Sequence, residues 1–253
     1  SVADEVYATF AIPTWLTGSI MAIFAAMVII GSVKRIAQVA ASLVPFMAAI
    51  YIIAALVILL INIDKIPAAF LLIIDSAFSG AAASGGFLGA TIWMAIRWGF
   101  ARGIFSNEAG LGSAPIAHAA AKTNDPVKQG MVAMLGTFID TLIICSLTAF
   151  VIITTGAWES GLKGAPMSSL AFSTGLYGYG GYVVTFGLVL FAFTTILGWS
   201  YYGERCASYL FGTNFIFYYR ILWISAIFIG AVIKLEMVWT FADIFNGLMA
   251  LPN

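Results

Sequence analysis

The 253-residue chain contains very little charge. Only 9% of its residues are charged, whereas soluble domains carry about 25%. Hydrophobic residues make up 62% of the chain, and its mean hydropathy is +1.03. The eleven basic and eleven acidic residues cancel, so the chain lacks the basic surface that a nucleic-acid partner requires. This composition excludes a soluble enzyme and a nucleic-acid-binding protein, and it predicts an integral membrane protein in a lipid bilayer.

Residues that carry enzyme or metal chemistry are also scarce. The two cysteines, Cys145 and Cys206, lie in apolar runs and fit neither a disulfide framework nor a CxxC site. The single histidine, His118, supplies the residue types of a hydrolase triad together with Ser106 and Asp140. However, Ser106 would lie roughly 18 Å from it along a helix. The chain also contains no Walker loop, HExxH or GxSxG motif. We therefore do not expect an enzyme.

Long apolar runs dominate what is present. A helix that crosses the hydrocarbon core needs about 20 mostly apolar residues, and the strands of an outer-membrane barrel would instead alternate apolar and polar residues. The runs are continuous, so we predict an all-α integral membrane protein. The expected spans are Trp15–Val33, Val44–Ile63, Phe87–Phe105 continuing to Ala121, Val127–Thr154, Tyr182–Tyr202, Phe217–Ile233 and Val238–Leu251.

Three further segments do not fit a span. Ser1–Thr9 is acidic and is expected to be an exposed lead-in, with the chain beginning partway through a longer polypeptide. Pro67–Phe78 is apolar but short and holds Asp75, which favours a re-entrant or surface helix. Gly156–Gly181 is polar and rich in glycine, so we expect a long folded loop. The basic residues that flank the spans favour an outer position for this loop.

Three places are expected to interrupt the spans. Gly103–Gly112, written GIFSNEAGLG, contains three glycines, an asparagine and a glutamate where the middle of the membrane is expected. Such a break survives only where protein or a water-filled cavity satisfies the backbone, although a simple loop between two short spans is an alternative. The other two places are Thr194–Trp199, with two hydroxyls and a glycine, and Asp243–Gly247.

Ionisable residues inside a bilayer are costly and indicate function. An unwound stretch at Ser106–Gly110 would expose backbone N–H groups and carbonyls, which attract a carboxylate and a cation respectively. Asp140, with Thr137 and Thr141 beside it, offers hard oxygen ligands for Na⁺ or a proton, or it pairs with a buried arginine. Glu108 either binds a cation or ammonium group or stabilises the start of the following half-helix. The residues of this class are Arg97, Arg102, Glu108, Asp140 and Asp243.

Long segments of the chain resemble one transporter family. The segment ARGIFSNEAGLGSAPIAHAAAKTNDPVKQGMVAMLGTFIDTLI, residues 101–143, resembles the signature region of the alanine or glycine:cation symporter family of bacteria and archaea. Residues 31–60, the segment NIDKIPAAF and the segment FTTILGWSYYGER are similar to that family too. The resemblance covers essentially the whole chain.

The resemblance implies a leucine-transporter-type fold, in which two inverted repeats of five helices have unwound first and sixth helices. Trp15–Val33 and Val44–Ile63 would then be the fourth and fifth helices, placed with an outer surface helix in residues 1–80. Phe87–Ala121 would be the broken sixth helix, which opens a second repeat in residues 81–253 containing the outer loop at residues 156–181. The first three helices would be missing, and these N-terminal helices of the same polypeptide would be partners of the chain.

The resemblance also implies Na⁺-coupled symport of alanine and glycine by alternating access across the cell membrane of a bacterium or archaeon. Phe105, Ser106 and Asn107 match the unwound segment that lines the amino-acid site. Thr195 and Trp199 match the wall formed by the eighth helix, where Trp199 would limit the pocket to small side chains.

Ions and gating are assigned in the same way. Thr194 and Thr195 match the hydroxyls around a sodium ion, although on the residues alone such hydroxyls usually bond to the carbonyl four residues earlier. Asp140 lies near a cation ligand of the seventh helix, and Asp243 resembles an acid of the outer gate on the tenth helix. The alternative is a proton-coupled amino-acid symporter that uses Asp140 or Glu108.

Overall fold

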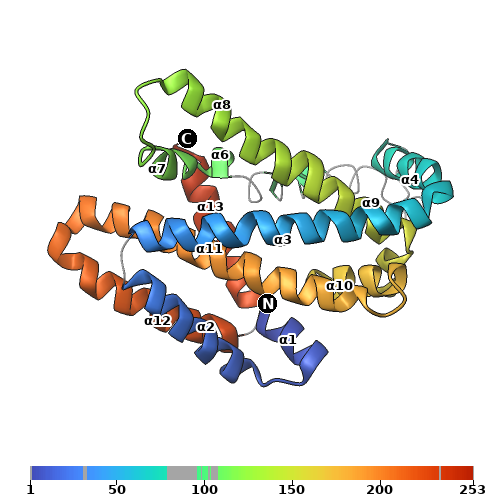
Figure 1. The fold of residues 1–253 in the computed structure, drawn as a ribbon, viewed down its shortest axis with the longest axis horizontal. Coiled ribbons are helices and arrows are strands. Elements are labelled where there is room, and N and C mark those ends of the chain that lie inside the picture. Colours follow the sequence, from blue (N-terminus) through green and yellow to red (C-terminus); the bar gives the residue numbers. More distant parts are fainter. Residues whose placement is uncertain are drawn as a thin grey trace. The chain divides into compact units, whose positions relative to one another are not determined.

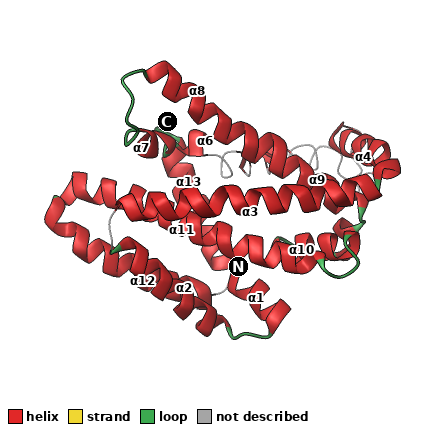
Figure 2. Cartoon of the chain, viewed as in Figure 1, coloured by secondary structure: helices red, strands yellow, loops and turns green. Residues whose placement is uncertain are grey.

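A computed structural model describes residues 2–30, 33–78, 96–97, 99–101, 103, 108–233 and 235–252. The described residues form helices joined by turns and loops, and none of them lies in a strand (Figure 2). This confirms the predicted all-α class. Most of the expected span Phe87–Phe105, together with the expected site residues Ser106 and Asn107, lies outside the described residues.

Figure 1 shows the helices of the described residues in chain order. Their bounds are α1 Val2–Phe10, α2 Thr14–Ile29, α3 Val33–Ile61, η1 Ile63–Lys65, α4 Ile66–Phe78, α6 Glu108–Leu111, α7 Ala114–His118, α8 Pro126–Thr137, the π-helix η3 Phe138–Cys145, α9 Ser146–Thr154, η4 Ala157–Ser160, α10 Ala165–Gly175, α11 Gly180–Phe211, η5 Thr213–Phe215, α12 Ile216–Val232 and α13 Leu235–Ala250.

Four of the described helical runs are long and apolar enough to cross a membrane. They are Arg35–Ile61, Pro126–Thr154, Gly180–Phe211 and Thr213–Val232, with lengths of 27, 29, 32 and 20 residues. The first predicted span is shorter than expected, because α2 has only 16 residues. These lengths and compositions fit a protein of the bilayer.

Several helices extend beyond the predicted spans. α3 begins at Val33 rather than Val44, and α11 continues past Tyr202 to Phe211. The added turns contain polar and charged residues, which a count of apolar residues leaves out although the backbone continues as helix. Pro45 lies inside α3, as proline in apolar helices often does.

Two predicted interruptions are wrong. Thr194–Trp199 lies inside the continuous helix α11, and Asp243–Gly247 lies inside the continuous helix α13. In α11 the hydroxyl of Thr194 bonds within the helix, so it does not compete with the backbone pattern. A single glycine is also common in membrane helices.

The segment after the first predicted interruption is more irregular than expected. Helix resumes at Glu108 but ends at Leu111, and it does not continue to Ala121. Gly112 has a φ of +75°, a conformation that glycine adopts without steric cost and that ends the short helix. A second short helix, α7, then ends at His118.

The terminal and connecting segments also contain helix. Residues 2–10 form α1, with Glu5 only 2% exposed, so the expectation of an exposed lead-in is wrong. The segment Pro67–Phe78, predicted to be a re-entrant or surface helix, is helical and belongs to the 13-residue α4, while its position relative to the membrane stays a prediction. The loop Gly156–Gly181 is folded as expected and contains η4 and α10.

The chain divides into two compact units. The first consists of residues Ser1–Ala54 and Ala157–Thr240, and the second of residues Ala55–Gly156 and Phe241–Asn253. The division at residue 80 into two repeats stays a prediction.

The first unit is built around α2, α11 and α12, with α2 lying along α12 (Figure 1). Ala25 and Ile29 of α2 and Leu197 of α11 are almost fully buried, and Trp223 of α12 packs against them. On another side of α11, the ring of Tyr51 lies 5.0 Å from that of Phe172 in α10, centroid to centroid.

Small residues bring these helices close together. A Cβ atom added at Gly18 of α2 would lie 2.6 Å from the Cβ of Ala231 in α12. A Cβ at Gly203 of α11 would overlap the hydroxyl of Tyr219 in α12. Because helices in lipid associate through close van der Waals packing, these glycines hold the first unit together.

We predict that Gly18→Ala lowers the thermal stability of the purified protein, because the added methyl group overlaps Ala231. Overpacking of this kind costs about 1–3 kcal/mol. Gly230→Ala is the matched control, since nothing lies within 4 Å of the Cβ position at Gly230 in α12. Thermal unfolding in detergent measures both variants. Equal melting temperatures would contradict the close approach of α2 and α12.

Candidate functional site

A π-helical segment lies in the longest described run of the second unit. Asp125 caps the start of α8, and its Oδ1 accepts hydrogen bonds from the backbone N–H groups of Val127 and Lys128 at 3.0 and 3.2 Å. The run then widens into the π-helix Phe138–Cys145 before α9 begins. π-Helical turns are rare and are frequent at functional sites.

Asp140 lies in the first turn of this π-helix. The hydroxyl of Thr141 donates to its Oδ2 at 3.4 Å, and the side chain of Asp140 is half-buried. The charge of Asp140 marks it as a candidate in the sequence. The π-helical turn leaves no signal there, because residue hydropathy is the same in an α- and a π-helix.

A cavity of about 350 Å³ brings two of the predicted acidic residues of the second unit together. It lies between the short helices α6 and α7 on one side and α8 with the π-helix on the other. Glu108 and Asp140 both line it. Its other lining residues are Ala109, Ala114, His118, Gly130, Ala133, Met134, Gly136 and Thr137.

His118 is a lining residue that the sequence analysis did not assign to this cavity. Its Nδ1 lies 2.7 Å from the amide Nε2 of Gln129. Because an amide nitrogen only donates, Nδ1 accepts this bond and the ring proton is on Nε2. The short helix α7 and the following turn therefore place an imidazole beside the same cavity as the two carboxyl groups.

The cavity combines groups that bind a proton or a hard cation. Carboxylates and hydroxyls are hard oxygen ligands, and histidine exchanges protons near neutral pH. Acidic and histidine side chains in series also form proton relays in membrane transporters. Of the two predicted basic partners of Asp140, Arg97 is exposed and Arg102 lies outside the described residues.

On α11, the predicted site residues lie on two different faces. Thr194 is 8% exposed and belongs to the buried stripe of the helix. Its hydroxyl is directed at the carbonyl oxygens of Leu190 and Phe191, at 3.1 and 3.0 Å. The hydroxyl proton is therefore used within the helix, as the residues alone suggested for this threonine, and its lone pairs remain able to accept.

Thr195 and Trp199 lie away from that stripe. Thr195 is exposed and Trp199 is half-buried, and a spacing of four residues puts them one turn apart on the same face. The indole of Trp199 meets the ring of Tyr202 edge to face, with centroids 5.7 Å apart. This face of α11 thus carries one hydroxyl and an aromatic surface.

The structure does not bring the remaining predicted site residues into either of these places. Asp243 is exposed on the continuous helix α13. Phe105, Ser106 and Asn107 lie outside the described residues, so their role stays a prediction.

A partly buried ion pair joins α11 to α12. Arg220 donates from Nε to Glu204 Oε2 at 2.8 Å and from Nη2 to Oε1 at 3.2 Å. The two-point geometry fixes both side chains, since paired N–H donors match the two carboxylate oxygens. This pair connects two helices and is a structural contact of the first unit.

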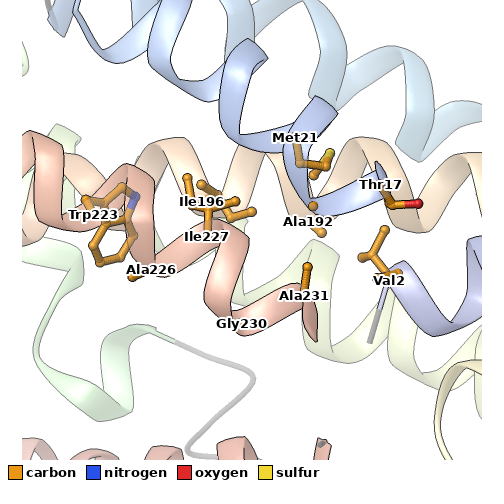
Figure 3. A pocket seen from close by; sticks show the side chains of 12 residues that line it. Val2, Thr17, Met21, Ala192, Ile196, Trp223, Ala226, Ile227, Gly230 and Ala231 are labelled. Atoms are coloured by element: carbon orange, nitrogen blue, oxygen red, sulfur yellow. The ribbon is translucent and has the colours of Figure 1, made fainter. Parts of the chain in front are cut away.

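A second cavity, of about 300 Å³, lies in the first unit between α1, α2, α11 and α12 (Figure 3). Thr17 of α2 and Trp223 of α12 lie at opposite ends of it, and alanine, glycine and isoleucine form most of the wall. None of its described lining residues is charged. Such a cavity offers nothing to neutralise the charged ends of a free amino acid.

Comparison with known proteins identifies the family. The whole chain, residues 1–253, matches the model of the sodium:alanine symporter family. It is 53% identical over 247 residues to an uncharacterized transporter of Haemophilus influenzae, covering 97% of this chain and 54% of that protein. It is 49% identical over 257 residues to a sodium/alanine symporter of Methanococcus maripaludis, covering 100% of this chain and 56% of that protein.

A more distant relative is a probable sodium/glutamine symporter of Bacillus subtilis, 40% identical over 228 residues, or 89% of this chain and 47% of that protein. The chain thus spans about half the length of these relatives. On the match over all its residues and these identities, the chain belongs to the sodium:alanine symporter family.

Proposed function

We propose that this protein is a Na⁺-coupled symporter of small neutral amino acids, with alanine and glycine as substrates, in the cell membrane of a bacterium or archaeon. The observation that carries the proposal is the family match over residues 1–253. The similarity to the sodium/alanine symporter of Methanococcus maripaludis supports both the ion and the substrate. The membrane-length helices support the location.

The arrangement that suits this function is the leucine-transporter-type bundle. In this proposal α2 and α3 are the fourth and fifth helices, and α6 and α7 belong to the broken sixth helix. The run from α8 to α9 is the seventh helix, and α11, α12 and α13 are the eighth to tenth. Helices N-terminal to this chain in the full-length protein complete the bundle.

The two faces of α11 support this arrangement. Its buried stripe, with Thr194 and Leu197, packs within the first unit. The opposite face, with Thr195 and Trp199, is available to an amino acid, a cation or a further helix. We assign the coupled Na⁺ chiefly to Thr195, because the hydroxyl proton of Thr194 is already directed at backbone carbonyls, and Thr194 contributes only its lone pairs.

The amino-acid site in this proposal lies between the unwound segment and α11. Backbone N–H groups and carbonyls around Phe105, Ser106 and Asn107 hold the two charged ends of the substrate. The indole of Trp199 forms the wall beside the substrate side chain and restricts its size. Asp243 of α13 takes part in closing the outer side during alternating access.

The Na⁺ gradient supplies the energy for uptake. One elementary charge that crosses a potential of 100 mV gains about 2.3 kcal/mol, before any concentration term. Na⁺ and the substrate bind next to each other and to the same outward-open conformation. Binding of either one therefore raises the affinity for the other, which couples their transport.

Uptake of labelled alanine into liposomes that contain the full-length protein tests the proposal. We expect an inward Na⁺ gradient at fixed pH to stimulate uptake, and excess glycine to compete with alanine. Leucine and glutamine are expected not to compete, because the wall at Trp199 excludes larger side chains. Alanine uptake that is indifferent to Na⁺ would refute the coupling, and competition by leucine would refute the small pocket.

Thr195→Val tests the assignment of the ion. The change keeps the shape of the side chain and removes the hydroxyl, so we expect uptake to require a higher Na⁺ concentration. Thr148→Val is the matched control, because the Thr148 hydroxyl donates to the carbonyl of Ile144 in the preceding turn and has no proposed role in transport. An unchanged Na⁺ dependence in Thr195→Val would remove this residue from the ion site.

Proton coupling is a second candidate, favoured by the cavity that joins Glu108, His118 and Asp140. We expect Asp140→Asn to abolish any alanine uptake that is driven by a pH step in liposomes, because an amide cannot exchange the proton. Na⁺-driven uptake is expected to survive in this variant. Asp125→Asn, which replaces an exposed-loop carboxylate and keeps a helix-capping side chain, is the control. Equal pH-driven uptake in both variants would exclude Asp140 as the proton carrier.

A further inference from the structure

A buried acidic group lies in the first unit, at a place that the proposed transport site does not use. Glu5 of α1 is 2% exposed, and Thr185 of α11, which faces it, is 1% exposed. The hydroxyl of Thr185 lies 3.2 Å from Glu5 Oε1, and that of Thr9 lies 3.4 Å from the same oxygen. The two hydroxyl oxygens are 3.0 Å apart.

The hydrogen bonds available here do not satisfy the carboxylate. Two hydroxyl protons are shared among Glu5 Oε1, the hydroxyls themselves and the carbonyl oxygen of Gly181, which lies 3.0 Å from the Thr185 hydroxyl. The second carboxylate oxygen, Glu5 Oε2, is buried and has no hydrogen-bond partner in the described part of the chain. A buried ionised oxygen without a partner is strongly unfavourable.

The described helices around Glu5 do not supply a positive charge to balance it. α1 packs against α2, α10, α11 and α12. Within the described bounds of these four helices, the charged side chains are Glu204, Arg205 and Arg220. Arg220 is paired with Glu204. Arg205 lies twenty residues beyond Thr185 on α11, about 30 Å along the helix.

The tyrosines on the same helices cannot balance the charge of a carboxylate either, because a tyrosine side chain is never positively charged. On α1 itself the neighbour Asp4 is acidic and exposed. The cluster therefore has one buried carboxyl group and several neutral oxygen atoms, contributed by two helices that are far apart in the sequence.

We propose that Glu5, Thr9 and Thr185 form a binding site for a monovalent alkali cation, with the Gly181 carbonyl as an additional oxygen ligand. A carboxylate, two hydroxyls and a carbonyl are all hard oxygen ligands, the type that hard cations prefer. One carboxylate neutralises one positive charge, whereas sites for Ca²⁺ commonly use several carboxylates. The bound cation satisfies Oε2 and ties α1 to the start of α11.

This site is separate from the proposed transport ion, and its existence does not rest on the proposed function. Thr185 precedes Thr194 by nine residues on the continuous helix α11, which places them about 13 Å apart along its axis. The ion at Glu5 is a structural one, since its ligands are buried within the first unit and the coupled ion of a symporter must be released on each cycle.

Binding of radioactive Na⁺ to the purified full-length protein tests the site. We expect Glu5→Gln to bind one Na⁺ fewer per protein than the unmodified chain. Thr185→Val and Thr9→Val are expected to weaken the same binding step by about tenfold or more, the effect commonly seen when a metal site loses a supporting group. Glu159→Gln is the matched control, because Glu159 is an exposed glutamate of the same unit.

The Thr195→Val variant separates this proposal from the transport proposal. It is expected to bind the coupled ion more weakly and to keep the ion at Glu5 unchanged, while Glu5→Gln is expected to lose the ion at Glu5 and to keep the coupled ion unchanged. Should Glu5→Gln not fold, the two threonine variants give the same readout. Equal Na⁺ stoichiometry and affinity in Glu5→Gln or in both threonine variants, relative to Glu159→Gln, would overturn the site and assign a neutral, protonated carboxyl to Glu5.

Discussion

The constraint on which this structure depends is that hydrocarbon offers no partner to a backbone N–H or carbonyl group. The membrane-length runs are accordingly helical, and side-chain hydroxyls inside them bond to the carbonyl one turn earlier. Thr148, Thr154 and Thr194 all do so. This is why a cluster of hydroxyls and a glycine in α11 leaves the helix continuous, whereas the glycine at position 112, with its positive φ, ends one.

Because lipid is as apolar as a leucine side chain, the helices of the first unit are joined by shape and by polar contacts. α2 meets α12 where Gly18 faces Ala231, and α11 meets α12 through the ion pair of Glu204 and Arg220. These contacts use one side of α11. They leave Thr195 and Trp199 on its other side, so the packing of the first unit itself separates a structural face from the face proposed for transport.

Acidic side chains that are withdrawn from solvent to different degrees occur in both units, half-buried at Glu108 and Asp140 and fully buried at Glu5, and their surroundings differ. Glu108 and Asp140 line a cavity together with an imidazole, an arrangement suited to exchange of protons or ions. Glu5 is enclosed by hydroxyls of α1 and α11, which suits an ion that stays in place. A carboxyl group that lines a cavity is thus suited to exchanging ions or protons, whereas one enclosed by protein is suited to holding an ion in place.

The sequence by itself determined the helical class, the membrane environment and the family. Long apolar stretches indicate the first two and continuous motif segments indicate the third, and both are properties of residues that are adjacent in the chain. The sequence also marked Asp140, Thr195 and Trp199 as candidates. Hydropathy did not show the ends of α3 and α11 or the π-helical turn at Asp140, because it is blind to polar helical turns and to the type of helix. The cavity beside Asp140 depended on how helices meet. Only the tertiary structure showed Glu5 to be buried, because its partner Thr185 lies 180 residues away in the sequence, and no local pattern records a contact over that distance.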